Sequence, residues 1–251
     1  MRFRQVLVDR KIGNKSRRAP HEVIAVKPPG TNFNFEVNNM KKLTVLLTCF
    51  NKEKYISYIL HQLVSQNCED IIIHIIDDGS TDHSLEIIQE IVGDIPNFYI
   101  HSFDKNYGIG YARQYALSLV ESGYFIFIDA DDMIVEDYIQ TILATIAANT
   151  ADIHHFLTRT YPYGTTACLS HTLWDKVISI DFIRKNNIDF DKTLYYNEDI
   201  DFRQQIEKTH FKEQHYNKIL YIYNLFTNDS ITHEQPLWYK HGDEGLKEEL
   251  I

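Results

Sequence analysis

From residue 41 onward, short apolar runs alternate with segments whose apolar residues recur at helical spacing, and this alternation limits the folds open to the chain. The apolar runs, read as strands with the turn residues that follow them, span 41–50, 70–80, 97–103 and 124–130. The helical segments span 51–66, 81–92, 108–121 and 135–148. Strands that alternate with helices form a mostly parallel sheet covered on both faces. We therefore expect an α/β fold.

Three of the predicted strands end in polar residues, at 48–51, 77–80 and 129–132. Ligands of parallel sheets bind outside the carboxyl ends of the strands, so chemistry is expected there. The third end, in FIFIDADDM, gathers Asp129, Asp131 and Asp132, whose mutual repulsion costs stability. A surface turn on Asp explains one or two carboxylates more readily than three. The alternative is a site for a cation and a charged ligand, because clustered hard oxygens suit Mg²⁺ or Mn²⁺.

Length and composition indicate an ordinary globular protein. The 251 residues are 44% hydrophobic and 24% charged, which suits one large domain or a domain with an appendage. The three cysteines lack metal-ligand spacing, so neither a disulfide framework nor a zinc site is expected. No apolar run approaches the roughly 18 residues of a membrane span, and the charged start lacks the apolar core of a signal peptide. A cytoplasmic location is therefore expected, while the oligomeric state is left open.

The charge is unevenly spread along the chain. Residues 1–39 hold eight Lys and Arg against three acids, a net of +5, whereas the whole chain carries −10. Pro, Gly and Asn interrupt any period in KPPGTNFNFEVNN, so residues 1–39 are predicted to form an extension around a main domain at 40–251. The extension either packs on the body or contacts an anionic partner.

Five motifs in order resemble the inverting family 2 glycosyltransferases with the GT-A fold. They are LTVLLTCFNKEKYI, IIIHIIDDGSTDHS, NYGIGYAR, YFIFIDADDMI and YYNEDIDF, and the resemblance covers about residues 41–232. It implies transfer of a sugar, with UDP as the usual carrier, from a nucleotide-diphosphate sugar to a hydroxyl of a saccharide or surface glycan precursor. It also implies a nucleotide-sugar-binding half at 40–133 and an acceptor-side half at 134–251.

The resemblance places the nucleotide at the first two strand ends. Thr48, Phe50 and Asp78 would hold the base and ribose, with Glu53 and Asp77 as weaker candidates. Phe50 offers a stacking face where the family often has Tyr, or else packs in the core. Asp78 alternatively caps the DGST turn.

NYGIGYAR resembles the segment that lets a helix approach the nucleotide sugar closely, through Gly108 and Gly110. A dinucleotide fingerprint is rejected because Arg113 stands where that motif needs a third small residue. Arg113 is either a ligand of the sugar or phosphates, since its fork suits oxyanions, or a surface residue of an amphipathic helix.

DAD at 129–131 resembles the Asp-x-Asp motif of the family. Asp129 and Ala130 would lie against the nucleotide sugar, and Asp131 would bind the Mn²⁺ or Mg²⁺ that neutralises the leaving diphosphate. Asp132 is the second choice for the metal. The late region YIYNLFTNDSIT has Asn224 where the family has Arg and lacks the His before Ser230, so His233 is a further metal candidate or simply a surface or core residue.

The acceptor side resembles a Trp-x-Lys segment followed by a Glu-Asp pair that begins a helix. Inversion needs a base opposite the leaving group, and Asp199 is the candidate for it, with Glu198 beside it for the acceptor or for tuning the base. Both acids alternatively just favour the first turn of a helix. Trp174 either stacks on a sugar or packs in the core.

Three other functions compete with this one. A phosphatase of the haloacid dehalogenase type also has an apolar strand before Asp-x-Asp, but there the motif opens the domain, and here Met133 follows the acids. A non-catalytic nucleotide-sugar binder would account for the missing His. Glycosylation of a modified nucleic-acid base would use the basic extension for phosphate contacts, although a body near −15 opposes extensive DNA binding.

Overall fold

The computed structural model describes residues 24–26, 43–66, 71–167 and 172–227. The predicted alternation is confirmed, with β2 (Leu43–Cys49), α1 (Ile56–Val64), β3 (Ile71–Asp77), α2 (Ser84–Val92), β4 (Phe98–Ser102), α3 (Ile109–Ser118), β5 (Tyr124–Asp129) and α4 (Tyr138–Ala148). The helices α1, α2 and α4 begin three to five residues later than their predicted starts at 51, 81 and 135. The residues in between form the loops at the strand ends.

The remaining elements complete the sheet and its cover. They are β1 (Ile24–Val26), β6 (Met133–Ile134), β7 (Ile153–Tyr161), β8 (Thr166–Ala167), β9 (Lys176–Ser179), α5 (Ile180–Asn186), α6 (Glu198–Glu207) and β10 (Glu213–Asn224). α6 begins at the Glu-Asp pair, as predicted. Among the described residues, no helix combines the length and apolar character needed to cross a membrane.

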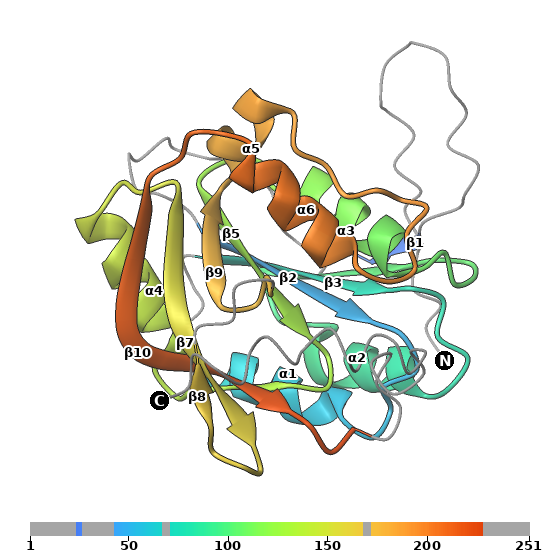
Figure 1. Cartoon of the computed structure of the whole chain (residues 1–251). Coiled ribbons are helices and arrows are strands. Elements are labelled where there is room, and N and C mark those ends of the chain that lie inside the picture. Colours follow the sequence, from blue (N-terminus) through green and yellow to red (C-terminus); the bar gives the residue numbers. More distant parts are fainter. Residues whose placement is uncertain (1–23, 27–42, 67–70, 168–171, 228–251) are drawn as a thin grey trace.

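The strands form one continuous sheet in the order β1-β4-β3-β2-β5-β9-β7-β10-β6, with β8 paired to β7 (Figure 1). β4, β3, β2 and β5 are mutually parallel, as expected. β9 runs antiparallel to both β5 and β7, and β7 is parallel to β10. The sheet is therefore parallel in the first half of the domain and mixed in the second. The predicted division at 133/134 falls inside β6, within this sheet.

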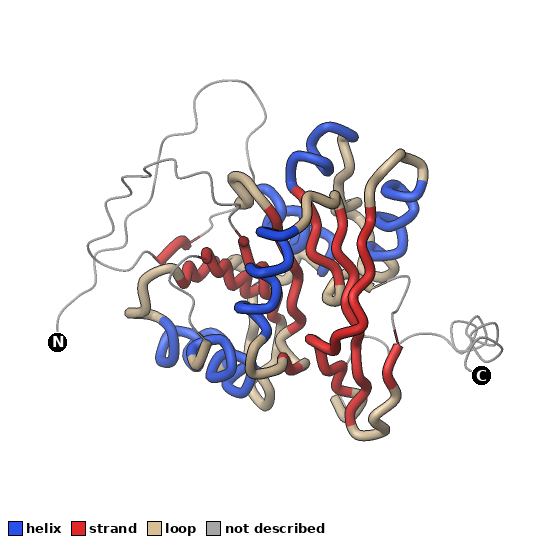
Figure 2. The backbone as a smooth tube through the Cα atoms, turned by 90° about the vertical axis from the view of Figure 1, so that its left-hand side faces the viewer, coloured by secondary structure: helices blue, strands red, loops and turns tan. Residues whose placement is uncertain are grey.

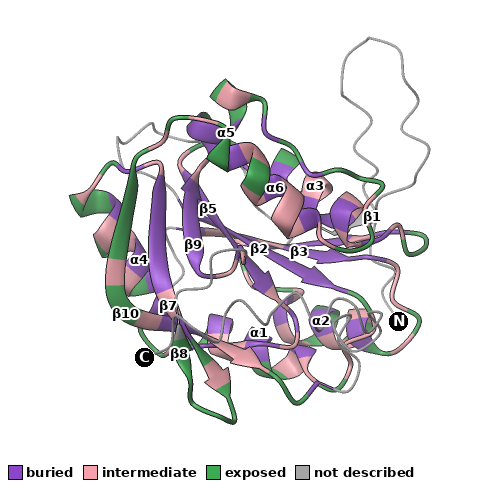
Figure 3. Ribbon diagram, viewed as in Figure 1, coloured by how far each residue is buried: buried purple, intermediate pink, exposed green. Residues whose placement is uncertain are grey.

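Two apolar clusters cover the two faces of the sheet. Alternate residues of β2 point to opposite clusters, with Leu43, Val45 and Leu47 in one and Leu46 in the other. The first cluster holds buried residues of α1, α2 and α4, and the second those of α3, α5 and α6. Figures 1 and 2 show helices on both sides of the strands. Figure 3 shows the central strands buried and the first half of β10 exposed.

The strand register brings the predicted strand ends together. Cys49 of β2 lies opposite Asp77 of β3, and Thr48 lies opposite Asp129 of β5. Three loops that are far apart in the sequence therefore leave the sheet at neighbouring points on one edge. This is the edge at which parallel sheets hold ligands.

Part of the predicted extension joins the sheet. Ile24–Val26 pairs antiparallel with β4, with Ala25 opposite His101. The rest of residues 1–39, and the boundary at 39/40, lie outside the described residues.

Candidate active site

A cavity of about 770 Å³ opens where β2, β3 and β5 end. Its walls also include the start of α3, the start of α6 and the loop before α6. Most residues predicted from the sequence line it, namely Thr48, Phe50, Glu53, Asp78, Gly108, Arg113, Asp129, Ala130, Asp131, Trp174, Glu198 and Asp199. Asp77 and Asp132 are not in the lining, and His233 lies outside the described residues. One pocket thus gathers strand ends from both halves of the domain.

The first wall follows β2 and β3. Thr48 is buried, while Phe50 is 39% exposed, so its ring is available to a ligand rather than packed in the core. Asp78 accepts hydrogen bonds from the backbone N–H groups of Tyr107 (2.8 Å) and Gly108 (2.9 Å). Burial nevertheless raises the pKa of Asp78 to about 7. The carboxylate therefore joins β3 to the loop before α3 and faces the cavity.

The two weaker nucleotide candidates, Asp77 and Glu53, hold loops in place. Asp77 is fully buried and accepts hydrogen bonds from the Ser102 hydroxyl (2.9 Å) and the Ser80 N–H (3.3 Å). Glu53 accepts from the His83 N–H at 3.1 Å and lies 2.8 Å from His83 Nδ1. Glu53 still lines the cavity, whereas Asp77 supports the turn that presents Asp78.

The three aspartates after β5 have different surroundings. Asp131 lines the cavity, and its Oδ2 lies 2.7 Å from Lys52 Nζ. Asp132 is buried, and accepts hydrogen bonds from the Tyr221 hydroxyl (2.7 Å) and the Asn224 N–H (2.8 Å). Burial and the neighbouring aspartates raise the pKa of Asp132 above its usual range. Asp132 thus fixes the turn to β10 while Asp131 faces the cavity.

Arg113 joins the Asp-x-Asp motif to α6. Its guanidinium donates to Asp129 Oδ1 at 3.0 Å through Nη2 and to Glu198 Oε1 through Nη1. Arg113 is only 4% exposed, so the alternative of a surface arginine on an amphipathic helix is wrong. The two carboxylates raise the pKa of Arg113 against the opposing effect of burial. A buried arginine that donates to two carboxylates on different segments fixes the relative position of those segments.

Glu198 and Asp199 begin α6 but differ in exposure. Glu198 is 5% exposed, and burial raises its pKa even though Arg113 opposes the shift. Asp199 lines the same cavity and is partly exposed. Asn197, which precedes them, adopts a left-handed conformation with φ of 61°, a region that Asn tolerates. This sharp turn into α6 sets the direction of Asp199.

The glycines of NYGIGYAR allow a close approach by the loop before α6. At Gly110 a Cβ atom would lie 2.5 Å from the Asp191 carbonyl oxygen and 2.6 Å from that of Leu194. Gly108, with φ of 90°, would meet the Tyr195 ring at 2.8 Å. The loop that carries Tyr195 thus packs directly on the start of α3, and Gly108 also lines the cavity.

Three lining residues, Lys52, Tyr195 and Tyr196, were given no role by the sequence predictions. Lys52 follows β2 and pairs with Asp131. Tyr195 and Tyr196 line the mouth and are 59% and 43% exposed. The predicted Trp174 also lines the cavity, where it stacks on Tyr223 with ring centroids 5.3 Å apart. The signal available for Lys52 was a lysine in the loop after a strand, and for Tyr195 and Tyr196 it was their place at the start of the YYNEDIDF motif.

The pocket fits a divalent cation of the Mg²⁺ or Mn²⁺ type. Asp131 and Asp129 supply hard carboxylate oxygens to the cavity lining. Within the described residues, this pocket offers no cluster of three protein ligands. Such ions are usually held by one or two carboxylates, with the remaining positions taken by water and substrate phosphates. Asp131 is the better-placed residue because both Asp132 oxygens accept hydrogen bonds from the protein.

Known proteins resemble this chain in sequence or in fold. Over 125 residues the chain is 38% identical to the teichoic acid poly(glycerol phosphate) polymerase of Staphylococcus epidermidis, covering 48% of this chain and 17% of that protein. Two solved structures have the same fold. One is Staphylococcus aureus TarS 1-349 with UDP-GlcNAc (TM-score 0.68, 22% identity, 76% of this chain and 60% of that chain). The other is a Pyrobaculum calidifontis mannosyltransferase with GDP-Man and Mn²⁺ (TM-score 0.59, 13% identity, 75% and 58%).

The chain spans about a sixth of the polymerase and under two thirds of either solved protein. The model of the family described as glycosyl transferase family 2 matches residues 44–216. This range includes the ends of β2, β3 and β5 at the cavity, but not Tyr223 of β10. The predicted resemblance is confirmed: this chain belongs to glycosyl transferase family 2 and has the GT-A fold.

Proposed function

We propose that the protein transfers a sugar from a nucleotide-diphosphate sugar to an acceptor hydroxyl, with inversion at the anomeric carbon and with a divalent metal. The observation that carries the proposal is one cavity lined by Phe50 and Asp78, by Asp129 and Asp131, and by Asp199. These groups offer a stacking face, carboxylates for a ribose and a cation, and an acid on a different helix. Family membership supports the same chemistry.

Each wall has its own task in this reaction. Phe50 and Asp78 hold the base and ribose, and Asp129 and Asp131 lie at the diphosphate. Bound there, a metal would act as a Lewis acid that neutralises the leaving nucleoside diphosphate. Asp199 removes the proton of the acceptor hydroxyl as its oxygen attacks the anomeric carbon, and the bond from that carbon to the diphosphate breaks. Arg113 and Glu198 keep the two walls in register.

A UDP-sugar and a saccharide acceptor are the specific substrates that we propose. TarS is crystallised with UDP-GlcNAc and is a poly(ribitol-phosphate) beta-N-acetylglucosaminyltransferase, which supports a UDP-sugar donor and a glycan-type acceptor. Tyr195, Tyr196 and Trp174 at the cavity would stack on sugar rings. Glycosylation of a nucleic-acid base is suggested only by the basic charge of residues 1–39. Most of these residues lie outside the described part of the chain.

Ligand-dependent melting tests the proposal directly. UDP-, GDP- and dTDP-sugars, each with and without Mn²⁺, are added to the full chain, and a true donor raises Tm because it binds the folded state. The UDP-sugar should give the largest shift with Mn²⁺ and then support transfer to a saccharide. Binding without transfer or donor hydrolysis would identify a non-catalytic relative. Full activity in the presence of a chelator would overturn the metal role and leave Lys52 as a cation near the diphosphate.

A further inference from the structure

A second group of possible metal ligands lies on the sheet, away from the cavity. His155 of β7 and His215 of β10 are register partners on adjacent parallel strands, so their side chains project from the same face. Glu213, two residues before His215, shares that face because side chains alternate along a strand. β10 then runs eight residues to Tyr223 in the cavity wall, about 25 Å at an extended rise.

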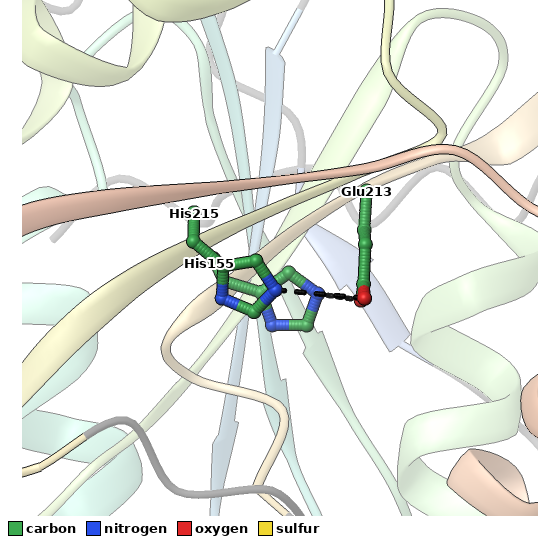
Figure 4. Close-up of side chains that lie close together, drawn as sticks. All are labelled: His155, Glu213 and His215. Atoms are coloured by element: carbon green, nitrogen blue, oxygen red, sulfur yellow. Dashed lines mark ion pairs between the residues drawn. The ribbon is translucent and has the colours of Figure 1, made fainter.

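The three side chains converge on one point, as Figure 4 shows. One ligand atom from each lies within 4.8 Å of the others. His155 Nε2 is 3.1 Å from Glu213 Oε2, and His215 Nε2 is 3.6 Å from Glu213 Oε1. The imidazole rings stack with centroids 4.3 Å apart and an angle of 13°. The side chains of His215 and Glu213 are 58% and 41% exposed. A small rotation of the His215 ring can therefore direct one nitrogen of His215 and Nε2 of His155 to the same ion.

His155, the buried member of the group, has features that suit a metal ligand. The His155 side chain is 3% exposed, and its Nε2 has no hydrogen-bond partner among the described residues despite the nearby carboxylate. Burial and the nearby cations Lys176 and Arg203 lower the pKa of His155. A buried nitrogen that forms no hydrogen bond is costly, and an ion held between it and the Glu213 carboxylate would give it a ligand bond.

Two cations near His155 oppose a bound ion. Lys176 pairs with Asp175 at 2.6 Å, and Arg203 pairs with Glu207 at 3.0 Å. Each of these carboxylates offsets the charge of its partner. Two imidazole nitrogens and one carboxylate, with solvent access at the exposed side, match the ligand set of an open zinc site and not the all-oxygen set that Mg²⁺ prefers.

We propose that His155, Glu213 and His215 form a binding site for Zn²⁺ or a similar transition-metal ion, distinct from the cation site at Asp131. The ion would clamp the start of β10 to β7. This half of β10 is largely exposed, and the pairing with β7 is irregular between His215 and Ile219. The ion would therefore stabilise the strand pair and leave sugar transfer nearly unchanged.

Thermal melting of the full chain with Zn²⁺ tests the site. At a hundredfold excess over Kd, a single folded-state site should raise Tm by about 5 °C or more. His215→Asn and Glu213→Gln, both at exposed positions, should lose this shift. Asp131→Asn and the exposed His61→Gln should keep it. With Co²⁺, the wild type should show the visible bands of a low-coordinate imidazole site, and His215→Asn should not.

Three results would overturn the site. They are no Zn²⁺ shift in the wild type, a full shift in His215→Asn, or loss of the shift in Asp131→Asn. The last would mean that Zn²⁺ acts in the cavity. Because the melting test requires no turnover, failure of the proposed sugar transfer would leave its outcome unaffected.

Discussion

Lys52 Nζ lies 2.7 Å from Oδ2 of Asp131, joining the loop after β2 to the Asp-x-Asp turn after β5. The Lys52 backbone is held by its N–H, which donates to Ser84 Oγ at 2.7 Å. Both charged side chains are mostly buried, at 13% and 14% exposure. A metal ion and Lys52 would therefore compete for the same carboxylate.

Removal of Lys52 should tighten binding of Mn²⁺ to the free enzyme. Lys52→Met deletes the competing cation and keeps much of the chain length, so the apparent Kd for Mn²⁺ should fall about fivefold, the equivalent of about 1 kcal/mol for a partly buried pair. Titration calorimetry with Mn²⁺ and no donor measures this. The exposed Lys105→Met, placed outside the lining, is the control. Weaker Mn²⁺ binding by Lys52→Met would show that the lysine supports the metal site instead.

Asp131→Asn should abolish or severely reduce transfer while leaving the fold intact, because it removes a charged hard ligand without changing shape. Asp132→Asn should behave differently, since Asp132 is buried against Tyr221 and Asn224. Its main effect should be a lower Tm. Transfer rates at several Mn²⁺ concentrations, with melting curves for both variants, separate these roles. An active Asp131→Asn enzyme would contradict the assignment of the metal.

Loss of Arg113 should destabilise the fold. Arg113→Met leaves Asp129 and the buried Glu198 without their shared cation, and breaking a buried pair in this way costs about 3 kcal/mol or more. Urea unfolding measures the loss. The double variant Arg113→Met with Glu198→Gln should lose less than the two single losses added together, because the groups interact directly. Additive losses would mean that the bridge contributes little.

Much of this arrangement could be predicted from sequence. The period of apolar residues identified β2 to β5, and the rule that ligands bind at strand ends directed attention to Asp78 and Asp131. The local sequence pattern and the direction of the strand are enough to predict that such residues lie at the ligand-binding edge of the sheet. The family motifs also placed Asp199 at the start of α6, where the structure has it.

Sequence could not distinguish adjacent acids whose directions depend on distant residues. Asp132 turns inward because Tyr221, 89 positions later, donates to it, and no local signal reports that contact. For Arg113 the sequence left a ligand of the sugar or phosphates and a surface residue as alternatives, because its partner Glu198 lies 85 positions later. At Gly110 a side chain would collide with the carbonyl oxygens of Asp191 and Leu194. These groups approach Gly110 only in the folded chain, so the sequence around Gly110 does not report the contact.

Asp78 should give stability a pH dependence. Burial raises its pKa from 3.8 to about 7, so the folded protein holds this proton more tightly than the unfolded chain. Protonation of Asp78 therefore contributes at most about 4 kcal/mol to the free energy of unfolding. This contribution is fully present below pH 3.8 and is lost as the pH rises through about 7. The wild type minus Asp78→Asn difference in the free energy of unfolding should therefore decrease as the pH is raised from 3.8 to 7. Urea unfolding across this range measures it, and a constant difference would contradict the prediction.

Asp199→Asn should reduce turnover and spare donor binding. Asn keeps the size of the side chain and its place in the first turn of α6, but it cannot accept the acceptor hydroxyl's proton. The expected loss in kcat is about 10² to 10⁴, the range for a positioned general base. Donor affinity should be nearly unchanged, because the nucleotide is assigned to the walls after β2, β3 and β5.

Glu198→Gln is the matched comparison, since it changes the neighbouring acid in the same way. Glu198 is buried against Arg113, so its loss should lower Tm and reduce kcat less than Asp199→Asn does. Transfer kinetics and donor binding are measured for both variants alongside melting curves. If Asp199→Asn stays active, or fails only because it no longer binds the nucleotide sugar, another group is the base. A larger kcat loss in Glu198→Gln, with its Tm preserved, would point to Glu198 itself.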